Sequence, residues 1–238
     1  LIAVCVKNPA IYDIIELIRA GIGEDTVLMP VMNGVSAADK LKEAFPENFV
    51  MNSVIYTVSS VEKDLSVKQL GGFTQIYAGA MEMDEASYER ALKVTELFSG
   101  AGIETHPERD VLSACWSKYI LNCAYNVVTA RWDVTIGEIK NSEKLYADYY
   151  QLMKEAMDVA LARGVSLKEN LLEINMKRLS HTTDDSTSSL SRDFNNKVKG
   201  EYELFSKDLL DMAKEAGVSA PVTEEYWNGI CERIASWE

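Results

Sequence analysis

The sequence predicts an α/β domain over residues 1–108 followed by an all-helical domain over residues 109–238. The segment up to Val31 is patterned as strand, helix and strand, a unit whose right-handed crossover builds a parallel sheet. Beyond Pro107, hydrophobic residues recur at helical spacing, and no strand pattern separates the helices. These two observations define the expected fold class.

The expected elements of the first domain follow from hydrophobic periodicity. Leu1–Val6 is a continuous apolar run, which is typical of a strand buried on both faces of a parallel sheet. Regularly spaced isoleucines predict a helix from Ile11 to Ile18, and Thr26–Val31 is a second buried strand. The later elements are a helix over 36–45, strands over 49–58, 65–70, 74–80 and 103–105, with a break at Gly71-Gly72, and a helix over 84–98.

The second domain is expected to consist of helices. They are predicted over residues 109–132, 142–163, 167–180, 201–216 and 223–237. Gly164 and Gly217 follow helix ends, where a left-handed cap is expected. The polar segment His181–Ser189 is predicted to be a loop that could move or become ordered on ligand binding, and a short helical stretch follows it.

Composition excludes several classes of partner. The formal net charge is −13, whereas nucleic acids and anionic membranes are bound by clustered Lys and Arg. We therefore expect neither nucleic acid nor membrane as a partner, and the longest apolar run is too short to span a bilayer. The four cysteines form no CxxC pair, which indicates a reducing, cytoplasmic compartment. The two histidines are far apart in the sequence, so no metal site is predicted.

The helix over residues 109–132 carries the most informative polar residues. It is apolar on nearly every side, yet Lys118, Asn122 and Asn126 follow one another at intervals of four and form one polar stripe. Burying an ammonium and two amides without partners is costly, so a buried stripe requires a counter-charge or a wet cleft. A stripe that faces solvent, with the lysine extended into water, is an equal alternative.

Candidate partners for such a lysine lie near the starts of later helices. Glu201 and Glu203 follow Gly200, where the helix dipole favours an acid whatever its function. Ser188 and Ser189 close the polar loop, and there hydroxyls and backbone N–H groups can hold an anion such as a carboxylate. Ordinary N-capping explains the same serines equally well.

Two strand ends of the first domain also carry polar residues. Lys7-Asn8-Pro9 follows the first strand and Asn33-Gly34 follows the second, and ligands of open α/β sheets bind outside these carboxyl ends. A structural turn is the competing explanation for Asn33-Gly34. The chain contains no phosphate-binding fingerprint, because Gly21-Ile-Gly23 follows a helix and precedes a strand, the reverse of the required context.

Taken together and in their order along the chain, these residues resemble the ketopantoate reductase (2-dehydropantoate 2-reductase) family. The matching pieces are the strand ending in Lys7, Asn33-Gly34, Trp116-Ser-Lys118-Tyr-Ile-Leu-Asn122, Ser188-Ser189 with Asp193, Gly200-Glu201 and Gly217-Val-Ser-Ala-Pro221. The family begins with a Rossmann domain and ends in a helical substrate domain. The resemblance therefore implies that residues 1–108 are the C-terminal half of a Rossmann-like domain. We expect a chain truncated before Leu1, without the phosphate loop.

The resemblance also implies a reaction: NADPH-dependent reduction of 2-dehydropantoate to pantoate, a step of pantothenate and coenzyme A biosynthesis. Lys118 matches the family's proton donor, and Glu201 matches an acid that contacts the cofactor ribose and the substrate hydroxyl side. Lys7 and Asn33 match cofactor-binding positions. The substrate-binding positions correspond to Asn33, Asn122, Asn126 and Ser189.

One position departs from the family pattern. Some members have asparagine before the Gly-Glu pair that corresponds to Gly137-Glu138, where this chain has Ile136. A related NAD(P)-dependent dehydrogenase with another 2-keto or 2-hydroxy acid substrate is therefore an alternative. A non-catalytic binding domain is a second alternative, which the missing phosphate loop motivates. A homodimer is the assembly that we consider for such a protein.

Overall fold

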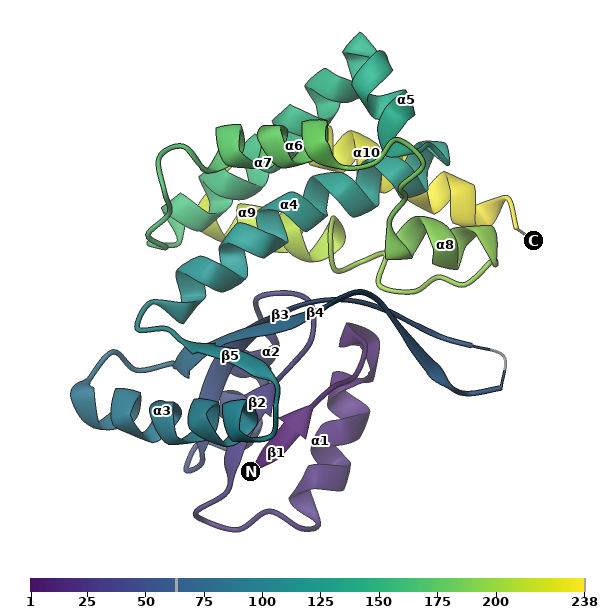
Figure 1. Cartoon of the computed structure of the whole chain (residues 1–238). Coiled ribbons are helices and arrows are strands. Elements are labelled where there is room, and N and C mark those ends of the chain that lie inside the picture. The colour runs from purple at the N-terminus through teal and green to yellow at the C-terminus, as the bar shows by residue number, and fades with distance from the viewer. Residues whose placement is uncertain (63, 238) are drawn as a thin grey trace. The chain divides into compact units, whose positions relative to one another are not determined.

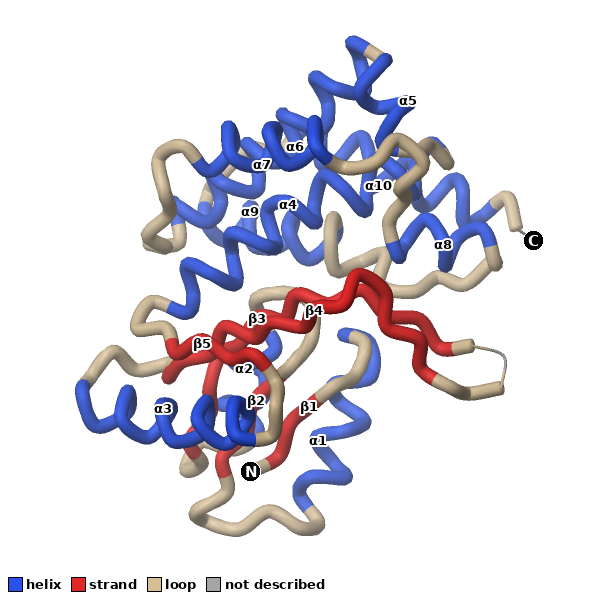
Figure 2. Tube along the Cα trace, viewed as in Figure 1, coloured by secondary structure: helices blue, strands red, loops and turns tan. Residues whose placement is uncertain are grey.

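The computed structural model describes residues 1–62 and 64–237. It divides into two compact units, Leu1–Cys115 and Trp116–Glu238. The first unit contains strands and helices, and the second contains helices joined by loops (Figures 1 and 2). This arrangement confirms the predicted fold class.

The described part of the first unit forms a five-stranded sheet in the order β1-β2-β3-β4-β5. Its strands are β1 (Ile2–Val4), β2 (Val27–Pro30), β3 (Phe49–Val61), β4 (Val67–Ala80) and β5 (Glu104–Pro107). β2 pairs in parallel with both β1 and β3, β3 and β4 are antiparallel, and β5 is parallel to β4. The predicted strand–helix–strand unit is the parallel pair β1–β2.

Helices cover both faces of this sheet. A 3₁₀ turn (Asn8–Ala10) leads into α1 (Ile11–Arg19), and α2 (Ala37–Ala44) and α3 (Glu85–Gly100) follow. Alternate residues of β2 point to opposite faces: Leu28 packs in a cluster with α1 and α2, whereas Met29 packs in a cluster with α3. The unit therefore has three layers, with the sheet in the middle.

Two strand predictions need correction. The segments 65–70 and 74–80 belong to one strand, β4, because the residues between them form a bulge rather than a break. Thr57 pairs with Thr74 while Val58 pairs with Leu70, and Gly71 adopts a φ of 79° within the bulge. The first strand is shorter than Leu1–Val6, and of its residues only Val4 is buried, because β1 lies at one end of the strand order.

The second unit contains the greater part of α4 (Val111–Trp132) and the helices that follow it. These are α5 (Ile136–Asn141), α6 (Glu143–Ala162), α7 (Leu171–His181), α8 (Ser189–Asn195), α9 (Lys207–Ala216) and α10 (Pro221–Ala235). α6 contacts α5, α7, α9 and α10. Gly164 and Gly217 adopt the expected left-handed conformation, with φ of 79° and 68°.

The helical predictions differ from the structure at three places, and one of these is the helix expected over 167–180, which begins only at Leu171. α5 was not predicted, since six residues are too few for a periodic pattern, although a capping box of Thr135 and Glu138 begins it. The helix expected over 201–216 begins only at Lys207, because residues 201–206 form turns that bury Leu204 and Phe205. Within the described part of the chain, no helix combines the length and the apolar character needed to cross a membrane.

Candidate active site

The polar stripe of α4 lies in the second unit and is not a solvent-exposed surface. Asn126 is buried, and Lys118 and Asn122 are half-buried. Thr129, which is fully buried, continues the same helix face one turn beyond Asn126. α4 therefore presents a row of polar groups that passes from a partly accessible end at Lys118 into the protein interior.

The buried end of the stripe holds the start of α8. Asn126 Oδ1 accepts hydrogen bonds from Ser189 Oγ at 3.3 Å and from the Leu190 N–H at 3.4 Å. The Thr129 hydroxyl donates to Ser188 Oγ at 2.7 Å. The predicted candidates Asn126 and Ser189 are thus brought together, although 63 positions separate them in the sequence.

Ser188 and Ser189 have different roles in this contact. Ser188 is 1% exposed, and its Oγ accepts the N–H of Ser191, so it is the N-cap of α8. Ser189 is exposed, so its hydroxyl reaches both the stripe and the solvent. Because the N–H groups of Leu190 and Ser191 already donate to side chains, an anion at this position would be held mainly by Ser189.

The turn that carries Glu201 is fastened to α4 next to Lys118. The Tyr119 hydroxyl is buried and donates to the Leu204 carbonyl at 2.5 Å, and the Leu204 N–H donates to the Glu201 carbonyl at 3.1 Å. Burial raises the pKa of Tyr119 well above its usual value, so the hydroxyl keeps its proton and remains a donor. Lys118 and Glu201 are both half-buried, and both have interaction partners in the structure.

Gly200 determines how the chain enters this turn. Its φ is 60°, and a Cβ at this position would lie 2.3 Å from Asp193 Oδ2. A side chain is excluded both by the left-handed backbone and by the carboxylate. The family motif residues Asp193, Gly200 and Glu201 are thereby linked in space.

α5 fixes the polar loop that precedes α8. The N–H groups of Ile136 and Gly137 donate to the carbonyls of Ser186 and Asp184, each at 2.9 Å. Lys140 Nζ lies 2.9 Å from Asp184 Oδ1, and a Cβ on Gly137 would approach the Asp184 Cβ to 2.8 Å. The loop is therefore packed tightly on α5.

The Ile136 side chain is 1% exposed. This chain therefore buries an apolar group at the position where the family resemblance suggested an asparagine.

Three residues that matter here were not predicted. Thr129 extends the stripe at helical spacing and could have been found by continuing the pattern. Tyr119 and Lys140 act on segments that are distant in the sequence, through Leu204 and the loop before α8, and nothing in the local sequence indicates those partners.

The first unit contains the other two candidates, Lys7 and Asn33. Each follows the carboxyl end of its strand by three residues, and the two strands are parallel neighbours with Val4 opposite Pro30. The Val31 N–H donates to the Val4 carbonyl at 2.8 Å, which extends this pairing toward both candidates. A cation and an amide therefore lie at the edge of the sheet where open α/β proteins bind their ligands.

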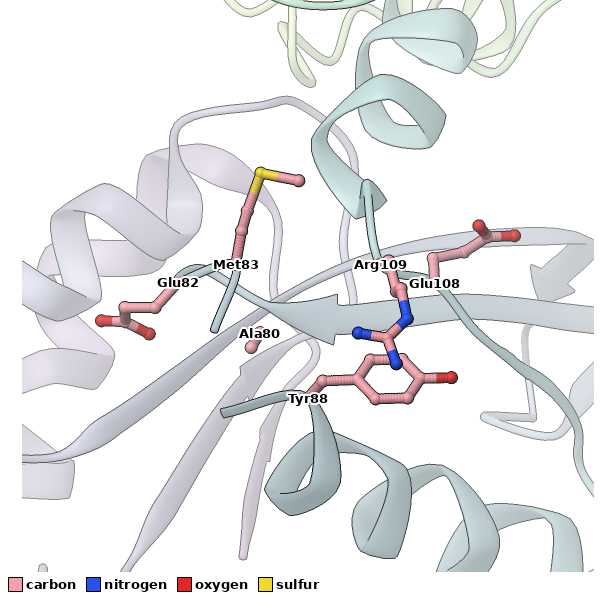
Figure 3. Close-up of a pocket in the computed structure, with 6 residues that line it drawn as sticks. All are labelled: Ala80, Glu82, Met83, Tyr88, Glu108 and Arg109. Carbon is pink, nitrogen blue, oxygen red and sulfur yellow. The ribbon is translucent and has the colours of Figure 1, made fainter. Parts of the chain in front are cut away.

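A small pocket elsewhere in the first unit contains none of the candidates. It is lined by Ala80, Glu82, Met83, Tyr88, Glu108 and Arg109. Figure 3 shows the Arg109 guanidinium over the ring of Tyr88. The Arg109 Cζ lies 3.8 Å from the ring centroid. Arg109 also forms hydrogen bonds of 2.9 and 3.1 Å to the Glu85 carboxylate, so this cation is already paired.

Two family models match the chain. The model "Ketopantoate reductase PanE/ApbA" matches residues 1–83, and "Ketopantoate reductase PanE/ApbA C terminal" matches residues 110–231. A relative described as 2-dehydropantoate 2-reductase, from Pyrococcus horikoshii, is 24% identical over 85% of this chain and 65% of its own length. The present chain thus spans about two thirds of that relative.

Solved structures share the fold. A dimeric ketopantoate reductase from Staphylococcus aureus has a TM-score of 0.82 at 18% identity, covering 98% of this chain and 77% of its own. D-mandelate dehydrogenase in a ternary structure with NADH and anilino(oxo)acetate has a TM-score of 0.88 at 16% identity, covering 99% and 77%. The solved structures show the fold, and the two family models, which match residues 1–83 and 110–231 and thus most of the chain, show that it belongs to the ketopantoate reductase family.

Proposed function

We propose that this chain reduces a 2-keto acid with NADPH, and that its substrate is 2-dehydropantoate, which it converts to pantoate for pantothenate and coenzyme A biosynthesis. The observation that carries the proposal is the intact stripe of Lys118, Asn122 and Asn126, joined to Ser189 in a chain of this family. The curated relative from P. horikoshii has the name of this activity, and the chain spans 65% of its length.

Lys118 is the proposed proton donor. Reduction of a ketone places negative charge on the carbonyl oxygen, and a half-buried ammonium can both stabilise that charge and supply the proton. Glu201 is the proposed counter-charge for Lys118, and the Tyr119–Leu204 hydrogen bond supports this by tying the Glu201 turn to α4 next to Lys118. Asn122 and Ser189 offer accessible polar groups for the substrate, while Asn126 holds Ser189 in place.

The carboxyl edge of the first sheet fits a nicotinamide cofactor. The Lys7 ammonium is exposed and suits an anionic or hydroxylated part of the cofactor, and the half-buried Asn33 amide suits its carboxamide end. When bound, such a cofactor supplies the hydride. NADPH rather than NADH is the finer part of the proposal, and it follows from the family resemblance.

A cytoplasmic homodimer is the proposed setting. The four cysteines, all in the described part of the chain, are free thiols, which suits a reducing compartment. The S. aureus relative is described as dimeric, and that supports the same assembly here.

The test is turnover of 2-keto acids by the full-length protein, followed through NADPH absorbance. We expect 2-dehydropantoate to have a higher kcat/KM than 2-keto acids without the hydroxymethyl branch. A preference for an unbranched acid would instead support a related dehydrogenase, the alternative raised by Ile136. Failure to bind either nicotinamide cofactor in a titration would favour a non-catalytic domain.

A further inference from the structure

Arg192 is a cation on the surface of α8, and the proposed reaction assigns it no role. It follows Ser189 by three residues, and residues at this spacing leave a helix on the same side. Its Nη1 donates to the Thr187 carbonyl at 3.1 Å. Since Thr187 precedes the N-cap of α8, the guanidinium is directed toward the end of the helix where Ser189 contacts Asn126.

The positive charge of Arg192 acts on a side chain of α4, that of Tyr125. Tyr125 lies three residues after Asn122, so its side chain leaves α4 next to that of Asn122. Burial raises the pKa of Tyr125, and the positive charge of Arg192 opposes this rise. Arg192 and Tyr125 are thus close enough to interact electrostatically, beside the stripe.

Arg192 is also available to a ligand. It is exposed, and among the residues that the structure describes none forms an ion pair with it. A guanidinium has five N–H donors, of which the Thr187 carbonyl takes one. The remaining donors match the two oxygens of a carboxylate in a planar, bidentate geometry.

We propose that the Arg192 guanidinium binds the carboxylate of the acid substrate next to Ser189, and thereby makes the site selective for 2-keto acids over their neutral amides. This inference rests on the proposed function, because it takes a 2-keto acid as the ligand. It assigns the selectivity for the acid to a residue that is neither in the stripe nor one of the matching motif residues named above.

The experiment compares a 2-keto acid with the corresponding 2-keto amide as substrates of the full-length protein and of Arg192→Gln. Loss of a charge-assisted pair raises KM for the acid by about 10-fold to 100-fold, whereas kcat, set by Lys118, changes little. KM for the amide stays nearly constant, so the preference for the acid falls by the same factor. The matched control is Arg178→Gln, which removes one exposed arginine of α7 and leaves both KM values unchanged.

The outcomes separate this inference from the proposed function. An unchanged acid-to-amide ratio in Arg192→Gln, with normal turnover, would overturn the role of Arg192 and leave the reaction intact. A lower kcat on both substrates together with a lower unfolding midpoint would also contradict it, because Arg192 would then only support Thr187. If the unmodified protein reduces no 2-keto acid, the proposed function and the inference both fail.

Discussion

Glu155 on α6 provides the sharpest prediction about stability. Its carboxylate is 1% exposed and accepts hydrogen bonds from the Val222 N–H at 3.0 Å, the Thr223 N–H at 2.8 Å and the Thr223 hydroxyl at 2.7 Å. These donors lie at the start of α10, directly after Pro221, so one side chain caps a helix from another part of the chain. The helix dipole adds to the attraction.

Replacing Glu155 by Ala leaves these donors without an acceptor in the interior. Each buried orphan costs about 1–3 kcal/mol, but removal of the desolvated charge offsets part of the loss, so we expect about 3 kcal/mol in total. Glu155→Gln keeps one acceptor oxygen and should cost about half as much. Glu215→Ala is the control, because the Glu215 carboxylate is 69% exposed and pairs with Arg163 at 3.1 Å; its loss should cost less than about 1 kcal/mol.

Tryptophan fluorescence reports on the relevant unit. All four tryptophans lie in the second unit, at positions 116, 132, 227 and 237. Urea unfolding followed by their emission therefore measures the stability of the unit that contains Glu155. The reasoning would be refuted by a Glu155→Ala protein that unfolds at the same urea concentration as Glu215→Ala.

Three further predictions test the site's surroundings. Gly217→Ala should lower the free energy of unfolding by about 1 kcal/mol, since Gly217 has a φ of 68° with open space around it. Gly200→Ala should lower it clearly more, because a Cβ there meets a carboxylate oxygen at 2.3 Å. Equal urea midpoints of the two variants would contradict this. Lys140→Met should speed amide exchange in the loop before α8, and unchanged exchange would mean that the ion pair does not hold that loop. Burial raises the pKa of Cys123 in the folded state, so its contribution to stability is complete below the unfolded thiol pKa, about 9, and declines as pH rises above it. In Cys123→Ala, the urea midpoint should therefore fall less steeply at alkaline pH than in the unmodified protein. An equally steep fall in the variant would count against this role of Cys123.

Local sequence patterns predicted what depends on periodicity. The spacing of Lys118, Asn122 and Asn126 placed them on one helix face, and the structure keeps them there. The parallel β1–β2 pair was predicted because a helix joins two apolar strands, and such a crossover connection joins parallel strands. The same reasoning missed the bulge of β4, since Gly71-Gly72 signals an interruption without indicating whether pairing resumes in the same strand.

Contacts between distant segments could not be predicted in this way. The Asn126–Ser189 hydrogen bond depends on how α8 packs against α4, and the true start of α9 depends on the Tyr119–Leu204 hydrogen bond. Helix propensity favours a helix from Glu201 onward, but tertiary packing of Leu204 and Phe205 overrides it. The local pattern left Glu201 and Glu203 as equal candidates, and only the family resemblance selected Glu201.

The central claim is that Lys118 donates the proton in reduction of a 2-keto acid, and the kcat of Lys118→Ala tests it most directly. Loss of a general acid predicts a decrease of about 10²- to 10⁴-fold in the full-length protein, with little change in the unfolding midpoint. Lys154→Ala is the matched control, because Lys154 is 46% exposed on α6 and pairs with Asp158 at 2.6 Å. A Lys118→Ala protein that reduces 2-dehydropantoate as fast as Lys154→Ala would contradict the account.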